Sequence, residues 1–438
     1  MDDKERILNL IFKFFVESKD YNGIPLRSIG DELEIDYKVS IDLIIELVMD
    51  DLVSIQSSTN PHIIGFQHFQ LEDQCHILQK AKSTTVTEHT MGDFTFYAEN
   101  TEFPICLYPS PAYLCKHRDL AEFGTAVYSK KLALGVPQLR LFYFDIEVLD
   151  RYAGDPRYAF RFEDYAGDIY CKYDENDRPL VRDEDEIFLK SFGLGYDEMG
   201  QRLAVVPLTY LKRLTPEHQV YWSGKEYTGQ GQVLREYYDN IILGEWTFRH
   251  SIFSGFIGEQ NCLNELAEKI FGKKLFKVSY TKEDRPREFT LFFKPTRKNY
   301  LDFVLLLDKM VSDNINKDFF RGEVDLEELV PIEGGMVERR QKGTLRIFED
   351  WMRKKCNGAD DAIQEIFKVF KKVRKERQEP AHKITANDYD KNYDKKQKEL
   401  ICEAYESMMN LRMAFASHED AKGFEVPGWL DPAKITPF

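Results

Sequence analysis

The spacing of apolar residues in the last hundred positions is the strongest constraint on the fold of this chain, because it repeats with the period of an α-helix. Three segments carry the pattern, at 343–355, 359–377 and 394–417. Apolar residues three and four positions apart form one stripe along a helix, and such a stripe is buried against neighbouring helices. We therefore expect residues 343–438 to form a helical bundle.

The second of these helices ends with an arginine on its apolar stripe. With 100° per residue from Ile363, Arg377 falls at about 320°, among the side chains of Ile366, Phe367, Phe370 and Val373. A guanidinium in that position is costly unless it is paired or faces a site. The alternatives are an ion pair with a buried acid, a side chain that reaches solvent at the helix end, and a site that binds an anion.

A histidine follows in the turn after this helix. Pro380 ends the helix because proline has no backbone N–H and its ring clashes with the preceding turn, so His382 lies just beyond Arg377. A guanidinium holds phosphate oxygens in a fork, and an imidazole moves a proton near neutral pH. Arg377 and His382 are therefore the candidate catalytic residues, with Gln378 and Arg374 in support.

The same helix is strongly basic. Residues 366–377 contain six Lys or Arg and one acid, a charge of +5 in a chain whose formal net charge is −15. Such a run is either a solvated helix face or a rim that attracts phosphate groups. The candidate phosphate-binding residues are Lys368, Lys371, Lys372 and Lys375.

An Arg-x4-His motif at the end of a core helix, with a polar residue after the arginine, resembles the HEPN ribonuclease superfamily. The resemblance covers about the last quarter of the chain, and Gln378 stands where Asn, Asp or His is commoner in that family. Two other Arg and His pairs have similar spacing, at 213–218 and 412–418. Arg213 lies off the apolar stripe of its expected helix, and we interpret Arg412 as a packing residue.

The resemblance implies a metal-independent endoribonuclease of toxin or antiphage-defence type that uses no cofactor. The ribose 2′-hydroxyl would attack the adjacent phosphate, with His382 as general base or acid and Arg377 stabilising the developing charge. The four lysines would bind RNA. Such sites are usually shared by two protomers, so a homodimer is implied.

Composition predicts a globular protein of the cytoplasm. The chain has 43% hydrophobic residues, a charged beginning, and no apolar run near the ~18 residues of a membrane span, so we expect no membrane association. Its seven cysteines are scattered without a Cys-x-x-Cys pair, which favours reduced thiols over a disulfide frame or a structural zinc site.

Residues 1–75 have the pattern of a winged helix-turn-helix. Helices are expected near 7–15, 26–33 and 37–52, followed by a wing hairpin with Asn60-Pro61 at its turn. Residues 1–70 hold six bases against thirteen acids, a charge of −7. Because nucleic acid is bound through basic side chains, this module favours docking of a protein partner over DNA binding.

The sequence pattern in the middle of the chain predicts the fold less specifically. Residues 76–255 alternate short β-like runs, at 94–97, 138–145 and 203–208, with turn residues, and we expect a mixed, mostly β domain. Polar residues at 214–222 could line a nucleotide pocket, although packing is the simpler interpretation. The acids that could gather around a metal match no metal motif; they are Asp145, Glu147, Asp155, Asp164 and Asp168.

Residues 256–342 form an α/β segment in this prediction. A helix at 260–271, a strand at 288–293 and a helix at 299–311 are expected, and Gly334-Gly335 predicts a joint before the last domain. The whole chain is thus predicted to be an α+β multidomain protein. The rival to the ribonuclease is a non-catalytic regulator or scaffold that docks a partner through its N-terminal module. A DNA-binding regulator is a third possibility.

Overall fold

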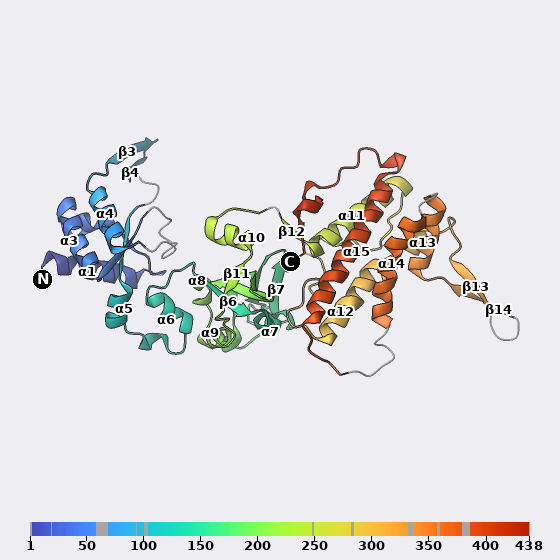
Figure 1. Cartoon of the computed structure of the whole chain (residues 1–438), viewed down its shortest axis with the longest axis horizontal. Helices are drawn as coiled ribbons and strands as arrows, with labels where there is room; N and C mark the ends of the chain where they lie inside the picture. Colours follow the sequence, from blue (N-terminus) through green and yellow to red (C-terminus); the bar gives the residue numbers. More distant parts are fainter. Residues whose placement is uncertain are drawn as a thin grey trace. The chain divides into compact units, whose positions relative to one another are not determined.

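A computed structural model describes residues 2–18, 20–57, 69–92, 94–99, 104–247, 249–281, 284–331, 336–356, 360–378 and 386–437. The protein is α+β, about 50% helix and 19% strand, with several small sheets and a helical C-terminal region (Figure 1). Its contacts divide it into two compact units. The first comprises Met1–Val148, Tyr152–Phe160 and Asp168–Gly244; the second comprises Leu149–Arg151, Arg161–Gly167 and Glu245–Phe438. The division into four segments remains a prediction.

The first unit begins with three helices and a three-stranded antiparallel sheet of order β1-β5-β2. Their bounds are α1 Asp3–Glu17, β1 Ile24–Pro25, α2 Leu26–Leu33, α3 Tyr37–Met49, β2 Val53–Gln56 and β5 Cys106–Pro109. The three predicted helices are confirmed. Asp2 and Asp36 begin α1 and α3 by accepting hydrogen bonds from backbone N–H groups of the first turn. The predicted wing turn at Asn60-Pro61 lies outside the described residues.

The middle strand of this sheet comes from far along the chain. Between β2 and β5 the chain forms a helix and a hairpin, α4 Leu71–Ala81, β3 Val86–Met91 and β4 Phe94–Glu99. Ile105 and Leu107 nevertheless join Ile7, Ile11 and Ile41 in one buried core. Two short helices follow β5, α5 Pro111–His117 and α6 Val127–Ala133.

A six-stranded sheet continues the first unit. Its order is β6-β10-β9-β8-β7, with β11 paired to β9. The elements are β6 Leu141–Asp145, α7 Asp150–Ala153, β7 Tyr158–Glu163, β8 Ala166–Cys171, β9 Phe188–Asp197, β10 Arg202–Pro207, α8 Leu208–Leu211, α9 Pro216–Ser223, β11 Gly231–Val233 and α10 Arg235–Tyr238. A Cβ at Gly193 would stand 2.2 Å from the Tyr237 ring, so only glycine allows that ring to pack on β9. The predicted strands near 94, 141 and 203 are confirmed as β4, β6 and β10.

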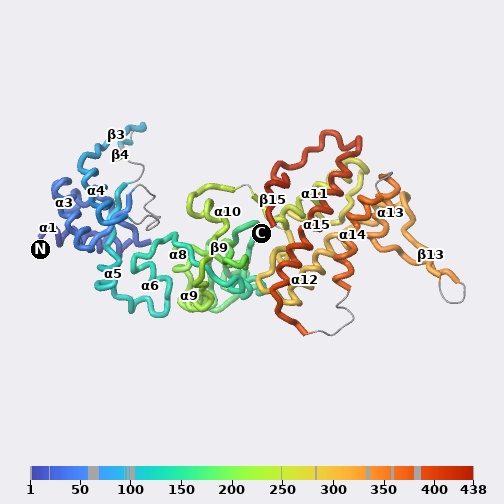
Figure 2. The backbone as a smooth tube through the Cα atoms, viewed as in Figure 1, coloured from blue at the N-terminus to red at the C-terminus, as the bar shows by residue number. Residues whose placement is uncertain are grey.

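The second unit is dominated by five helices. They are α11 Ile252–Phe271, α12 Arg297–Asp308, α13 Thr344–Lys355, α14 Asp360–Gln378 and α15 Asn392–Ala416. α14 contacts α12, α13 and α15, and α11 contacts α15 along its length (Figures 1 and 2). The short strands β12 His250–Ser251 and β15 Ile435–Thr436 pair in parallel. The predicted helices at 343–355, 359–377 and 394–417 match α13, α14 and α15 within two residues at each end.

The predicted strand at 288–293 was wrong. Phe289, Leu291 and Phe293 are buried, so the alternation of apolar residues is real, but the backbone here is not paired in a sheet. Instead, the buried amide of Gln397 on α15 donates to the carbonyl of Thr290 and accepts from the N–H of Phe292, at 3.1 and 3.4 Å. The Gln397 side chain thus makes the backbone hydrogen bonds that a neighbouring strand would otherwise make.

A β-hairpin that the sequence did not predict precedes α13. β13 Glu327–Pro331 and β14 Val337–Gln341 pair antiparallel and extend from the helices (Figure 2). Almost every residue of both strands is exposed, so no alternation of buried and exposed positions marks them. The expected joint at Gly334-Gly335 lies outside the described residues.

Candidate functional site

Arg377 lies in the last turn of α14 and bonds to a buried aspartate. The apolar stripe of α14 is buried, with Ile363, Ile366, Phe367, Phe370 and Val373 in the core. Nη1 of Arg377 donates to Oδ2 of Asp308, whose side chain is 0% exposed, whereas the arginine side chain is 36% exposed. A second carboxylate, Asp313, lies 3.8 Å from the same nitrogen. The arginine therefore spans from the helical core to the surface.

Asp308 is fully satisfied where it is buried. Its Oδ1 accepts from the hydroxyl of Ser312 at 2.8 Å, and Oδ2 accepts from Arg377. A buried carboxylate is tolerated only with such partners. The hydrogen bond with Asp308 raises the pKa of Arg377 above its usual range, so this guanidinium stays charged.

The backbone changes form at this ion pair. α12 ends at Asp308, and the chain continues as a π-helical turn, Lys309–Asp313, that holds Ser312 and Asp313. Single π-helical turns are rare and are found frequently at functional sites. The turn places both carboxylates that face Arg377 within six residues of each other.

Glu376 is bonded to the same helix α12. Its carboxylate accepts from the hydroxyl of Tyr300, and the Tyr300 ring stacks on Tyr393 of α15, with centroids 5.4 Å apart. Burial and the neighbouring Glu376 raise the pKa of Tyr300, so its hydroxyl stays protonated. The last turn of α14 is thus fastened to α12 by two side chains on successive residues.

Three other residues were predicted for the catalytic site, and the structure describes two of them, Gln378 and Arg374. Gln378 is the exposed last residue of α14. His382 lies outside the described residues. Arg374 is half-buried, and a Cβ placed on Gly343 would lie 3.8 Å from its Nη1, which puts this guanidinium beside the start of α13.

The four lysines are exposed, and three of them form ion pairs. Lys368 pairs with Glu365 at 3.1 Å and Lys372 with Glu403 of α15 at 2.8 Å. Lys371 lies 2.6 Å from Glu349 of α13, a side chain only 7% exposed that Arg353 also contacts at 3.0 Å. Within the part of the chain that the structure describes, neither Lys375 nor Arg374 has an ion pair.

Sequence reasoning missed Asp308, although a signal for it exists. Tyr300, Phe303, Val304 and Leu307 form the buried stripe of α12, and Asp308 follows at the next position of that stripe. An acid on the apolar stripe of one helix is the counterpart of an arginine on that of another. The wheel argument that singles out Arg377 would therefore have singled out Asp308 as well.

In each of the two other Arg and His pairs one residue is packed, Arg412 and His218, while Arg213 and His418 are exposed. Arg412 bonds through Nε and Nη2 to Glu259 of α11, with side chains 11% and 0% exposed, in agreement with a packing role. His218 is fully buried in α9, where its ring meets Tyr152 edge to face at 5.6 Å. This contact favours packing over a nucleotide pocket at 214–222.

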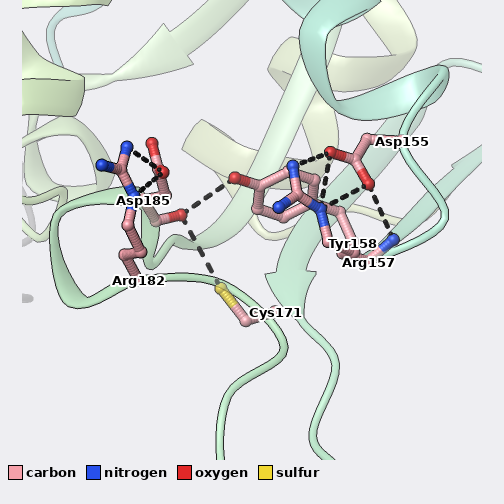
Figure 3. Close-up of polar contacts among 6 residues, drawn as sticks. All are labelled: Asp155, Arg157, Tyr158, Cys171, Arg182 and Asp185. Carbon is pink, nitrogen blue, oxygen red and sulfur yellow. Dashed lines mark hydrogen bonds and ion pairs between the residues drawn. The ribbon is translucent and has the colours of Figure 1, made fainter.

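The acids considered as metal ligands are engaged separately. Asp155 receives both Nε and Nη2 of Arg157, and nearby Asp185 pairs with Arg182 while its carbonyl accepts from the Tyr158 hydroxyl at 3.1 Å (Figure 3). Asp164 lies in the second unit and receives three other donors. Throughout the described ranges, no group of three or more His, Cys, Asp or Glu side chains is placed to hold a metal ion.

Asp164 is the one acid of these five that is buried, at 8% exposure. It accepts from Nδ1 of His250 at 3.1 Å, from the N–H of Ser251 at 2.7 Å and from the hydroxyl of Ser254 at 2.9 Å, at the beginning of α11. Burial alone would raise the pKa of Asp164, but these hydrogen bonds outweigh burial and hold the pKa below its usual range.

Comparison with known proteins gave no match to a family model, a curated protein or a solved structure. None of the described helices is both long and apolar enough to cross a membrane.

Proposed function

We propose that the C-terminal helical region is a metal-independent endoribonuclease of toxin or antiphage-defence type, with Arg377 and His382 as its catalytic residues. The observation that carries this proposal is the position of Arg377. Among the described residues, its hydrogen bond and ion pairs involve Nη1 alone, while about a third of the side chain stays exposed at the end of α14. A guanidinium has five N–H donors in a rigid fork. Its Nε and Nη2 edge is therefore oriented and suited to hold two phosphate oxygens.

The chemistry needs only groups of this kind. His382 removes the proton of a ribose 2′-hydroxyl, and the resulting oxygen attacks the adjacent phosphorus. The bond from phosphorus to the 5′-oxygen breaks, and that oxygen takes up a proton. Arg377 stabilises the negative charge that grows on the phosphoryl oxygens. The products are a 2′,3′-cyclic phosphate and a 5′-hydroxyl.

In this proposal two chains form the active site together. Each protomer contributes one Arg377 and one His382 to a shared cleft, so the homodimer is the active form. The N-terminal part is a winged helix that senses a trigger by docking a protein. Its charge of −7 over residues 1–70 supports protein docking over DNA binding.

The test is cleavage of total RNA and tRNA in the presence of EDTA, by the wild type and by His382→Ala. The proposal expects cutting that persists without metal and disappears in the variant, with cyclic phosphate at the new 3′ ends. Cutting that EDTA abolishes, or that His382→Ala retains in full, would contradict it.

A second candidate is a non-catalytic regulator or scaffold. The same ion pair favours it, because Arg377 bonded to Asp308 stabilises the contact of α14 with α12 without any role for a ligand. In that case Arg377→Lys, which keeps a cation on Asp308, would leave every function of the protein intact. The ribonuclease proposal expects the same variant to lose cleavage, since a lysine cannot form the fork.

A further inference from the structure

We propose that the RNA backbone runs from Arg377 across Arg374 to Arg346 at the start of α13. In this proposal Arg374 and Arg346 contact its phosphates in place of Lys368 and Lys372, the residues that the sequence alone suggests. This inference rests on the proposed ribonuclease function and names the surface that receives the substrate. We call this surface the α13–α14 strip; it consists of Lys342, Arg346, Arg353, Lys371 and Arg374 with the carboxylates Glu349, Asp350 and Asp360.

The strip begins beside the catalytic arginine. Arg374 is three residues before Arg377, so the two side chains are about 60° apart around α14 and one turn apart along it. Lys372, in contrast, is about 140° from Arg377 around the helix, and it points to Glu403 of α15. Only the side of α14 that carries Arg374 leads from Arg377 toward α13.

Arg374 connects α14 to the first residues of α13. Its Nη1 lies beside Gly343, the residue before α13 begins. Lys342 and Arg346 flank that glycine, and both contact one carboxylate, Asp350, at 2.8 and 3.4 Å. One step further, Lys371 and Arg353 share Glu349.

The charge balance separates the strip from the rest of α14. Its five cations face three carboxylates, because Arg353 also lies 3.6 Å from Asp360, and this leaves a charge of +2 on a chain of −15. On the α15 side, Lys368 and Lys372 each have one carboxylate partner, Glu365 and Glu403, so the charges of these two lysines are balanced one for one. A polyanion gains from contact with a surplus of cations, because it releases its own counterions there.

The ligand class follows from the side chains present. The strip has guanidinium and ammonium groups and no aromatic ring, so it offers contacts to phosphates and none of the stacking platforms that hold unpaired bases. We therefore expect binding that depends steeply on salt and little on base sequence.

The experiment measures binding without cleavage. In a His382→Ala background, a fluorescein-labelled single-stranded RNA of about 20 nucleotides is titrated by anisotropy at several salt concentrations. Arg346→Gln with Arg374→Gln is compared with Lys368→Gln with Lys372→Gln, a control that removes the same charge. The strip pair should reduce the slope of log affinity against log salt by about 1.4, which is two phosphate contacts at ~0.7 each, and the control pair should leave the slope unchanged.

An equal change in both pairs, or none in the strip pair, would overturn the inference. Arg346 is 62% exposed in its side chain, so Arg346→Gln alone tests the strip, with about half the change, if the double variant folds poorly. If the wild type cleaves RNA while the strip pair binds normally, the strip is wrong and the ribonuclease stands. If the wild type cleaves nothing while the strip pair alone loses binding, the strip stands and the ribonuclease is wrong.

Discussion

At the scale of single residues, the ion pair of Arg377 with the buried Asp308 is the central feature of the proposed site. Each lies on the apolar stripe of its own helix, where an unpaired charge would be strongly destabilising. Because the two side chains pair with each other, neither charge is left unpaired. It also fixes the guanidinium at the end of α14, which is the property that a phosphate-binding arginine needs.

Removing the arginine should therefore destabilise the fold. Arg377→Ala leaves Asp308 buried without its cation, and we expect a loss of about 2–4 kcal/mol in the free energy of unfolding, measured by urea denaturation. The double variant Asp308→Leu, Arg377→Leu should recover most of this loss, because no buried charge remains. Lys375→Ala is the exposed control and should change stability by less than about 0.5 kcal/mol. A loss equally small in Arg377→Ala would contradict the assignment.

The sequence places both members of this pair on apolar stripes, but it does not show that they bond to each other. The helical wheel places Arg377 on an apolar stripe, and an ion pair with a buried acid is one of the alternatives that this position allows. The identity of the acid could not follow, because Asp308 is 69 positions away and only the packing of α12 against α14 brings the two together. Whether His382 joins them remains a prediction, since that residue lies outside the described ranges.

Asp164 leads to a prediction on pH. Its pKa in the folded protein is below its usual range, so its hydrogen bonds stabilise the fold above the unfolded pKa of about 3.9 and lose this effect as pH falls through the folded pKa. Asp164→Asn should lower the urea midpoint at pH 7, and the difference from the wild type should shrink below about pH 4. Asp183→Asn, at an exposed position, is the control. A difference between Asp164→Asn and the wild type that grows on acidification would contradict the assigned bonds.

At the scale of secondary-structure elements, Gln397 shows that a pattern of apolar residues predicts burial but does not predict the hydrogen-bond partners of the backbone. The alternation at 288–293 predicts which side chains are buried, and Phe289, Leu291 and Phe293 are. It cannot say what satisfies the backbone, because a glutamine on α15 does so from more than a hundred positions away. The prediction of a strand assumed a neighbouring strand that the fold does not have.

Gln397 should contribute more to stability than most glutamines, because its amide makes two backbone hydrogen bonds. Gln397→Leu should cost about 1–3 kcal/mol of stability, because it leaves the partly buried N–H of Phe292 and the carbonyl of Thr290 without their side-chain partner. The backbone amide of Phe292 should also exchange its hydrogen faster in the variant. Gln378→Leu, at an exposed helix end, is the matched control. Unchanged exchange at Phe292 would show that these bonds do not hold the segment.

Helices were predicted more accurately than strands for a physical reason. α13, α14 and α15 each carry an amphipathic stripe long enough to fix the period. Local signals also predict where helices end, as Pro380 does for α14 and Gly272 for α11. The β13–β14 hairpin has almost no buried face. Without a buried face a strand leaves no alternation in the sequence, and nothing indicated these two.

At the scale of the whole molecule, the sequence predicts an α+β chain with a helical C-terminal region, which is confirmed. It does not predict that distant segments build one unit. β5 completes the N-terminal sheet from residues 106–109, and residues 161–167 belong to the second unit with the C-terminal helices. Such assignments depend on long-range contacts that composition and periodicity do not encode.

The proposed active form is a dimer, and its mass is directly measurable. We expect sedimentation equilibrium to give twice the chain mass of 51.5 kDa, because the shared cleft requires two copies. Residues 245–438 alone lack Asp164, so the full chain is the appropriate sample. A monomer that nevertheless cleaves RNA in EDTA would contradict the shared cleft.

The most direct test of the central claim is the rate of RNA cleavage in EDTA by Arg377→Lys, compared with the wild type at matched stability. Lysine keeps a cation against Asp308, so folding should be largely retained, but it cannot hold two phosphate oxygens in one plane. We predict a loss of about 100-fold or more in rate, the scale of one lost group that stabilises developing charge. A wild type that cuts RNA and an Arg377→Lys variant that cuts equally well would show that Arg377 only stabilises the fold.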